Sequence, residues 1–132
     1  MADYPAACAL WEASEGIGLS EADEPQNIAA YLLRNPGQSF VALQDGVLVG
    51  AVLCGNDGRR GFLHHLAVSA AARRQGTGRE LIRRGLAALS AQGMRKCHIF
   101  VKADNQDGKR FWGRVGWEER TTLVVFSADV PR

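Results

Sequence analysis

Two neighbouring glycines, Gly76 and Gly78, follow an apolar run and open the most regular helical pattern in the chain. The first amide groups of a helix have no partner within the helix, and the positive end of the helix dipole lies beside them. Because glycine has no Cβ, an anion can approach such a backbone closely. The junction at residues 66–79 therefore predicts a phosphate-binding site, with a flexible turn as the alternative.

Two known phosphate motifs do not describe this junction. A Walker A loop ends in Gly-Lys-Ser/Thr, which the chain lacks. The dinucleotide fingerprint requires a third glycine three residues after Gly78, but Leu81 stands there, and it also requires an acid about 20 residues further on. The junction therefore belongs to neither class.

Basic residues gather just after the two glycines. Such an excess favours an anionic partner, with a solvated helix face as the alternative. A nucleic acid is poorly supported, because the pI of 8.6 is modest and no recognition motif is present. The five arginines lie within twelve residues and are opposed by Glu80 alone: Arg73, Arg74, Arg79, Arg83 and Arg84.

Two adjacent histidines, His64 and His65, precede this junction on a predicted strand. Histidine is the side chain best suited to accept a proton near neutral pH. Strand alternation predicts that the two point to opposite faces, with His64 sharing the parity of Leu66 and Val68. Neighbours of this kind do not easily chelate one metal, only His98 remains as a third ligand, and no Cys-x-x-Cys is present, so we expect no metal site.

Hydrophobic period and turn residues define the elements that must position these groups. Asp45-Gly46 between two β-rich runs predicts a hairpin, and Asn35-Pro36-Gly37 and Gly93 end helices. The order of elements predicts an α/β fold, a mixed sheet with helices on both faces. The expected helices lie at residues 6–11 (capped by Asp3), from 20–24 onward to Asn35, at 76–92 and at 107–115; the expected strands lie at 39–44, 47–54, 61–68, 97–102 and 121–127.

Length and composition limit the class of protein. The 132 residues, 46% hydrophobic and 23% charged, predict one globular domain over residues 1–132. No apolar run is long enough for a membrane span and no secretory signal opens the chain, so we expect a cytoplasmic protein. Three scattered cysteines are read as reduced thiols, with Cys54 and Cys97 in the core. Residues 1–58 carry a net charge of −7 and residues 59–132 one of +9.

Two blocks together resemble a known family. Arg73-x-x-Gly76-x-Gly78 after a buried strand resembles the acetyl-CoA motif of the GNAT N-acetyltransferases, Gln/Arg-x-x-Gly-x-Gly/Ala. Asn105, followed by Phe111-Trp112 and Gly116-Trp117, resembles that family's later Asn, Phe-Tyr and Gly-Phe positions. The two blocks occur in the family's order, and the resemblance covers about residues 3–128. It implies a GNAT-like fold with a mixed, mostly antiparallel central sheet.

The resemblance implies how acetyl-CoA binds. The loop at residues 74–79 would hold the diphosphate through its backbone, and the strand at 66–68 would pair with the pantetheine arm. An amide near Val68 would polarise the thioester carbonyl. Asn105 would contact the cofactor, cap the following helix, or do both. The implied cofactor-binding residues are Leu66, Ala67, Val68, Arg73, Arg74, Gln75, Gly76, Thr77, Gly78, Arg79, Asn105 and Trp112.

The chain departs from the family at two places. Trp112 stands where the family has the Tyr that protonates the departing thiolate, and an indole is no practical acid. A thiolate of pKa about 8.5 needs little help to leave, so the loss of this group need not abolish activity, although it leaves the chain without the family's usual general acid. The family also opens with a strand before its first helix, whereas this sequence begins at about that helix. In the arylalkylamine branch a His two residues before the matching Leu acts as base, which implies His64, with a sheet-surface histidine as the alternative.

The implied activity is an acyltransferase that moves acetyl from acetyl-CoA directly to a primary amine. The alternatives are a CoA-binding module without catalysis, suggested by Trp112, and a basic nucleic-acid binder. In the family the first two helices, which here carry Trp11 and Tyr31, shape the acceptor pocket. A strand at 121–127 could pair between subunits of a homodimer. Acidic residues would attract a cationic acceptor: Glu12, Glu15, Glu21, Asp23 and Glu24.

Overall fold

The computed structural model describes residues 1–132 and divides them into two units, Met1–Phe100 and Val101–Arg132. Each unit is described on its own. No helix in either unit combines the length and the apolar character that crossing a bilayer requires.

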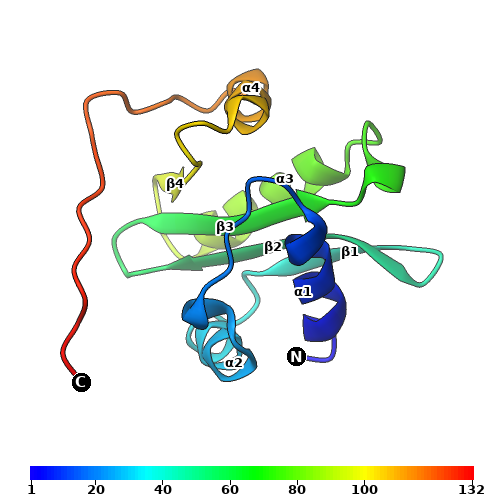
Figure 1. Ribbon diagram of the computed structural model, residues 1–132, viewed down its shortest axis with the longest axis horizontal. Coiled ribbons are helices and arrows are strands. Elements are labelled where there is room, and N and C mark those ends of the chain that lie inside the picture. The colour runs from blue at the N-terminus through cyan, green and yellow to red at the C-terminus, as the bar shows by residue number, and fades with distance from the viewer. The chain divides into compact units, whose positions relative to one another are not determined.

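A four-stranded sheet forms the centre of the first unit, in the order β1-β2-β3-β4 (Figure 1). β1 and β2 are antiparallel, β2 and β3 are antiparallel, and β3 and β4 are parallel. The predicted mixed, mostly antiparallel sheet is therefore confirmed. The strands are β1 (Phe40–Gln44), β2 (Val47–Asn56), β3 (Gly61–Val68) and β4 (Cys97–Ile99).

Helices cover both faces of this sheet (Figure 1). α1 (Tyr4–Ala13) and α2 (Pro25–Arg34) lie on one face, where Trp11 and Ile28 pack with Leu53 in one hydrophobic cluster. α3 (Thr77–Ala91) lies on the other face. It packs closely because Gly85 has no side chain: a Cβ there would sit 3.2 Å from Leu63 Cδ2.

The first two helices begin differently from the prediction. Asp3 occupies the N-cap of α1, but its side chain makes no capping hydrogen bond. The segment at 20–24 is not the start of α2; it forms a separate 3-10 turn, η1 (Glu21–Asp23). Pro25 explains the break, because the residue before a proline is driven into extended backbone, and Glu24 has ψ 153°. α2 then ends at Arg34, before Asn35-Pro36-Gly37 as predicted.

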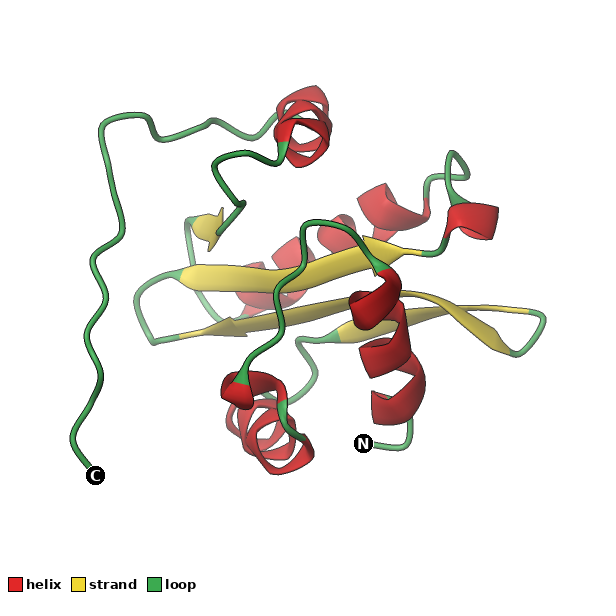
Figure 2. Ribbon diagram, in the orientation of Figure 1, coloured by secondary structure: helices red, strands yellow, loops and turns green.

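Two predicted strands are shortened or missing. β4 stops at Ile99 instead of continuing to residue 102, because β3 pairs with it only through Gly61, Phe62 and Leu63 (Figure 2). Residues 121–127 form no strand, and Phe126 is 93% exposed. A strand needs a neighbour for its backbone hydrogen bonds, and the second unit contains no other strand. The expected edge for pairing between subunits is therefore absent.

The second unit is built around one helix, α4 (Gln106–Arg114). Asn105 caps it, since its side-chain oxygen accepts from the Gly108 amide at 2.9 Å. The Trp112 and Trp117 rings pack against each other with their centroids 4.5 Å apart. Gly116, with φ 94°, allows the chain to reverse after the helix.

Candidate functional site

The loop between β3 and α3 has left-handed backbone at two positions. After the short turn η2 (Ala70–Ala72), Arg74 has φ 64° and Gly76 has φ 81°. Gly76 is the N-cap of α3, and no side chain caps this end. A Cβ at Gly76 would meet nothing within 4 Å, so glycine is required here by the backbone angle and not by crowding.

Unpaired amides line the start of α3. The first amide bonded in the helical pattern is that of Glu80, which donates to the Gly76 carbonyl at 3.0 Å. None of the amides of residues 74–79 makes a hydrogen bond of standard geometry to another backbone group. Together with the helix dipole they form a concentrated set of donors suited to a diphosphate. The residues present therefore fit the phosphate groups of CoA.

The arginines near this loop are in different environments. Nε of Arg73 donates to the Val68 carbonyl at 3.4 Å, which turns this side chain back onto the end of β3. Arg83 and Arg84 both pair with Glu80, at 2.6 and 3.1 Å. The hydrogen bonds from Arg83 and then Arg84 lower the pKa of Glu80 to about 2. Arg74 and Arg79 pair with no carboxylate and remain available to an anion.

One edge of β3 is open beyond the last pair with β4. β4 pairs with β3 only as far as Leu63, so residues 64–68 have no strand on that side. The Ser69 amide donates to the Val49 carbonyl at 2.8 Å. Because bonded and non-bonded pairs alternate in an antiparallel ladder, the amide of Val68 points away from β2 and toward this open edge. The edge can therefore pair with an extended ligand, directly before the unpaired amides of the loop.

A β-bulge interrupts β3 at the histidines. Between the pairs that His64 and Ala67 make with β2, β3 holds two residues, His65 and Leu66, where β2 holds one. His65 adopts a left-handed φ of 53°. An extra residue of this kind re-aims the side chains around it.

Both histidine rings lie on the sheet face covered by α1 and α2. Their centroids are 6.5 Å apart; the His65 ring is 5.2 Å from Trp11 of α1, and the His64 ring is 6.1 Å from Tyr31 of α2. The prediction that they point to opposite faces is wrong, because alternation holds only in a regular strand. His64 consequently shares its face with Ala67, a member of the same core, and not with residues 66 and 68.

His64 sits in a mostly aromatic environment. Its ring lies almost parallel to that of Phe62, at an interplanar angle of 6° and a centroid distance of 6.3 Å, and it also contacts Phe100. Burial lowers the pKa of His64, the charge of His65 lowers it further, and the charge of Asp23 opposes both effects. His64 is therefore neutral near pH 7 and carries a lone pair that can accept a proton.

An interaction missing from our sequence interpretation joins η1 to the bulge. The Nε2 atom of His65 lies 2.7 Å from Oδ1 of Asp23, which is only 8% exposed. The amide of Ser20 donates to the other carboxylate oxygen at 2.9 Å. The spacing Ser20-x-x-Asp23 marks a capping box in the sequence, so the fixed position of Asp23 could have been inferred, although its partner could not.

Two residues of the predicted site, Asn105 and Trp112, belong to the second unit. Asn105 serves as the cap of α4, and the Trp112 ring contacts both Phe111 and Trp117. In the second unit, Asn105 therefore stabilises the start of α4, and Trp112 packs among aromatic rings. The two residues keep their CoA-binding assignment as a prediction.

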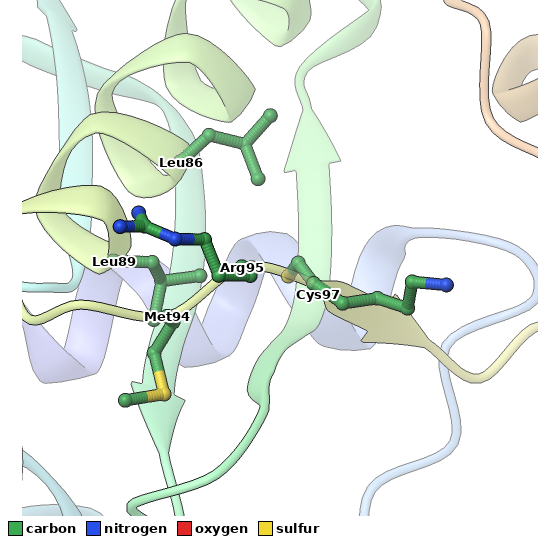
Figure 3. Close-up of a pocket in the computed structure, with 6 residues that line it drawn as sticks. Leu86, Leu89, Met94, Arg95 and Cys97 are labelled. Carbon is green, nitrogen blue, oxygen red and sulfur yellow. The ribbon is translucent and has the colours of Figure 1, made fainter.

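A shallow pocket lies at the C-terminal end of α3 and contains none of the predicted site residues (Figure 3). Burial raises the pKa of Cys97, which lines it, to about 11, and that of Cys54 in the neighbouring core to about 12. Both thiols are therefore protonated near neutral pH and act as packing groups. The pocket is lined by Leu86, Leu89, Met94, Arg95, Lys96 and Cys97.

Comparison with known sequences identifies the family. Residues 5–117 match the Acetyltransferase (GNAT) family. An acetyltransferase of Pectobacterium atrosepticum is 35% identical over 103 residues, which are 78% of this chain and 72% of that protein. An acetyltransferase of Yersinia pestis is 30% identical over 123 residues, 93% of this chain and 86% of that protein. The chain belongs to the GNAT family and is an acetyltransferase.

Solved structures share the fold. An aminoglycoside 6'-N-acetyltransferase from Acinetobacter haemolyticus superposes with a TM-score of 0.79 at 20% identity, covering 98% of this chain and 94% of that one. The PaiA N-acetyltransferase of Thermoplasma acidophilum, solved with coenzyme A, gives a TM-score of 0.73 at 16% identity, covering 89% and 84%. The predicted fold class is confirmed by this likeness.

Proposed function

We propose that this protein transfers the acetyl group of acetyl-CoA directly to a primary amine. The observation that carries the proposal is the set of unpaired amides at residues 74–79, directly after the open edge of β3. Solved relatives of the same fold support the donor, since one contains coenzyme A and another a bisubstrate analogue of CoA.

The donor would lie along the loop and the strand. The amides of residues 74–79 would hold the diphosphate: Arg74, Gln75, Gly76, Thr77, Gly78 and Arg79. The exposed backbone at 66–68 would pair with the pantetheine arm, and the Val68 amide would donate to the thioester oxygen as negative charge develops there. Bound acetyl-CoA supplies an activated acyl group with a thiolate leaving group.

His64 would accept the proton that the incoming amine must lose. A protonated amine has no lone pair and cannot attack a carbonyl carbon. The neutral imidazole takes this proton, and the amine nitrogen then forms the C–N bond. As the C–S bond breaks and CoA leaves as thiolate, the nitrogen loses a second proton to solvent, which gives the neutral amide. The thiolate needs no strong acid near neutral pH, which is consistent with Trp112 standing in place of a tyrosine.

The acceptor would be a cationic amine. Glu12 and Glu15 near the end of α1, and Glu21 and Glu24 around η1, are exposed and can attract positive charge. Asp23 no longer belongs with these groups, because it is buried against His65. The aminoglycoside N-acetyltransferases among the solved relatives act on amine-rich molecules, which supports this class.

A thiol-release assay tests the function. Purified protein is mixed with acetyl-CoA and a panel of small amines and amino-terminal peptides, and free thiol is followed with a chromogenic reagent. We expect amine-dependent release with at least one cationic acceptor. Tight binding of CoA in calorimetry without turnover on any amine would instead support a CoA-binding module, and absence of binding at millimolar CoA would contradict the site itself.

A further inference from the structure

Asp23 and His65 form a buried pair outside the donor site described above. The carboxylate of Asp23 can only accept hydrogen bonds when ionised, so the hydrogen between the two groups is carried on Nε2 of His65. The second carboxylate oxygen is occupied by the Ser20 amide. The hydroxyl of Tyr4 donates to the Asp23 carbonyl at 2.7 Å, which further fixes η1. These hydrogen bonds hold both the backbone and the carboxylate of Asp23 in place.

The pair also fixes the His65 ring beside His64. The bulge places both rings on one face. Trp11 packs against the His65 ring, and the Asp23 carboxylate holds Nε2 of His65. A cationic imidazole at this distance opposes protonation of His64, while the Asp23 carboxylate behind it favours protonation. His64 consequently senses two opposing charges from one rigid arrangement.

Apart from His65, the rings that contact His64 directly are a phenol and two phenyl groups, which carry no charge near neutral pH. Tyr31 reaches it from α2, and burial raises the pKa of this phenol, so it stays protonated. Phe62 and Phe100 contact it from β3 and the end of β4. His98 of β4 contacts Phe62, with ring centroids 5.8 Å apart.

We propose that Asp23 and His65 act as positioning residues for His64, setting the charge beside it and thereby the pH range in which it accepts the amine proton. The inference rests on the proposed function, in which His64 is the proton acceptor. The direction of the His64 pKa, lowered by His65 and raised by Asp23, agrees with this geometry. The pair would thus adjust the pH at which the enzyme becomes active.

A direct measurement of His64 tests the proposal without any activity. The pH titration of the His64 ring protons is recorded by NMR in the unliganded protein, in His65→Gln, and in the double variant with Asp23→Asn. Glutamine can still donate to Asp23, and asparagine can still accept from Ser20, so both changes keep the hydrogen bonds of η1. His98→Gln, which alters a nearby histidine on β4, is the matched control.

The expected shifts have opposite signs. His65→Gln removes the opposing charge and moves the His64 midpoint to higher pH. Adding Asp23→Asn removes the favouring charge and moves the midpoint back to lower pH. His98→Gln leaves it in place. A His64 midpoint that is the same in wild type and His65→Gln overturns the proposal.

The kinetic arm separates this proposal from the proposed function. In the profile of kcat/KM against pH, the acidic limb should move upward in His65→Gln, in step with the NMR midpoint, while the KM for acetyl-CoA stays constant. His64→Gln should lose that limb. If His64→Gln keeps the acidic limb, the assignment of His64 as the base is wrong. The His64 midpoint measured by NMR then still tests whether Asp23 and His65 set its pKa. If His64→Gln loses the acidic limb but the His64 midpoint does not move in His65→Gln, His64 remains the proton acceptor and the proposed role of Asp23 and His65 is wrong.

Discussion

Replacing Gly78 with aspartate should have opposite effects on stability and on CoA binding. Gly78 is the second residue of α3, and its amide is one of the unpaired donors at the helix start. A carboxylate in the first turn of a helix interacts favourably with the dipole, by about 0.3–1 kcal/mol. We therefore expect Gly78→Asp to raise the free energy of unfolding slightly, as measured in urea.

The same carboxylate would face the bound diphosphate. One negative charge about 6 Å from two phosphate charges is repelled by roughly 1.4 kcal/mol at the dielectric constant of water and by about 5.5 kcal/mol at an effective value of 20. The loop is exposed, so the lower part of this range applies. The Kd for CoA should therefore rise at least about tenfold.

Isothermal titration calorimetry with CoA provides the assay, and Gly78→Ala provides the matched control. Alanine adds the Cβ without the charge, so it separates crowding from repulsion. We expect a larger loss for aspartate than for alanine, and the difference should shrink as salt is added. Equal affinities for the two variants, with both proteins folded, would refute the assignment of the diphosphate to these amides.

Three further predictions concern stability. Because the pKa of His64 is lowered in the folded state, the unfolded chain binds more protons below about pH 6.5. The free energy of unfolding should therefore fall as the pH drops through this range. His64→Gln should flatten that slope, as measured by urea unfolding at several pH values. A Cβ at Gly55 would lie 2.5 Å from the Tyr31 hydroxyl, so Gly55→Ala should cost about 1–3 kcal/mol, whereas Gly113→Ala, where a Cβ meets nothing within 4 Å, should cost nothing. Asn105→Ala should remove about 1 kcal/mol from α4, seen as faster amide exchange in its first turn; unchanged exchange would argue against the cap.

Local turn chemistry explains why much of the fold could be predicted. Asp45 and Gly46 both have positive φ, at 52° and 78°, as a two-residue hairpin requires. Gly93, with φ 83°, follows the last residues of α3 as expected. The free amides of the loop follow in the same way from a glycine pair at a helix start. These features depend on residues adjacent in sequence, and so the sequence alone contains them.

The histidine face could not be predicted in this way. The bulge places a non-glycine residue, His65, in left-handed backbone, and no local residue type signals it. Its partner Asp23 lies 42 residues earlier, and the contact exists only because η1 and β3 meet in three dimensions. The missing strand at 121–127 also reflects a non-local requirement. Its β-rich residues favour a strand, but strand formation depends on a partner that local sequence does not specify.

The extra residue in β3 links two requirements that a regular strand cannot meet together. A histidine pair on one face needs two consecutive side chains with the same orientation, while Ala67 must still enter the core and Val68 must still offer its amide at the margin. Deleting one of the two bulge residues would restore regular alternation: Ala67 would keep its partner and its place in the core, but His64 would lose the second histidine beside it on this face. Any attempt to transplant this proton-accepting arrangement onto another scaffold must therefore carry the insertion along with the histidines.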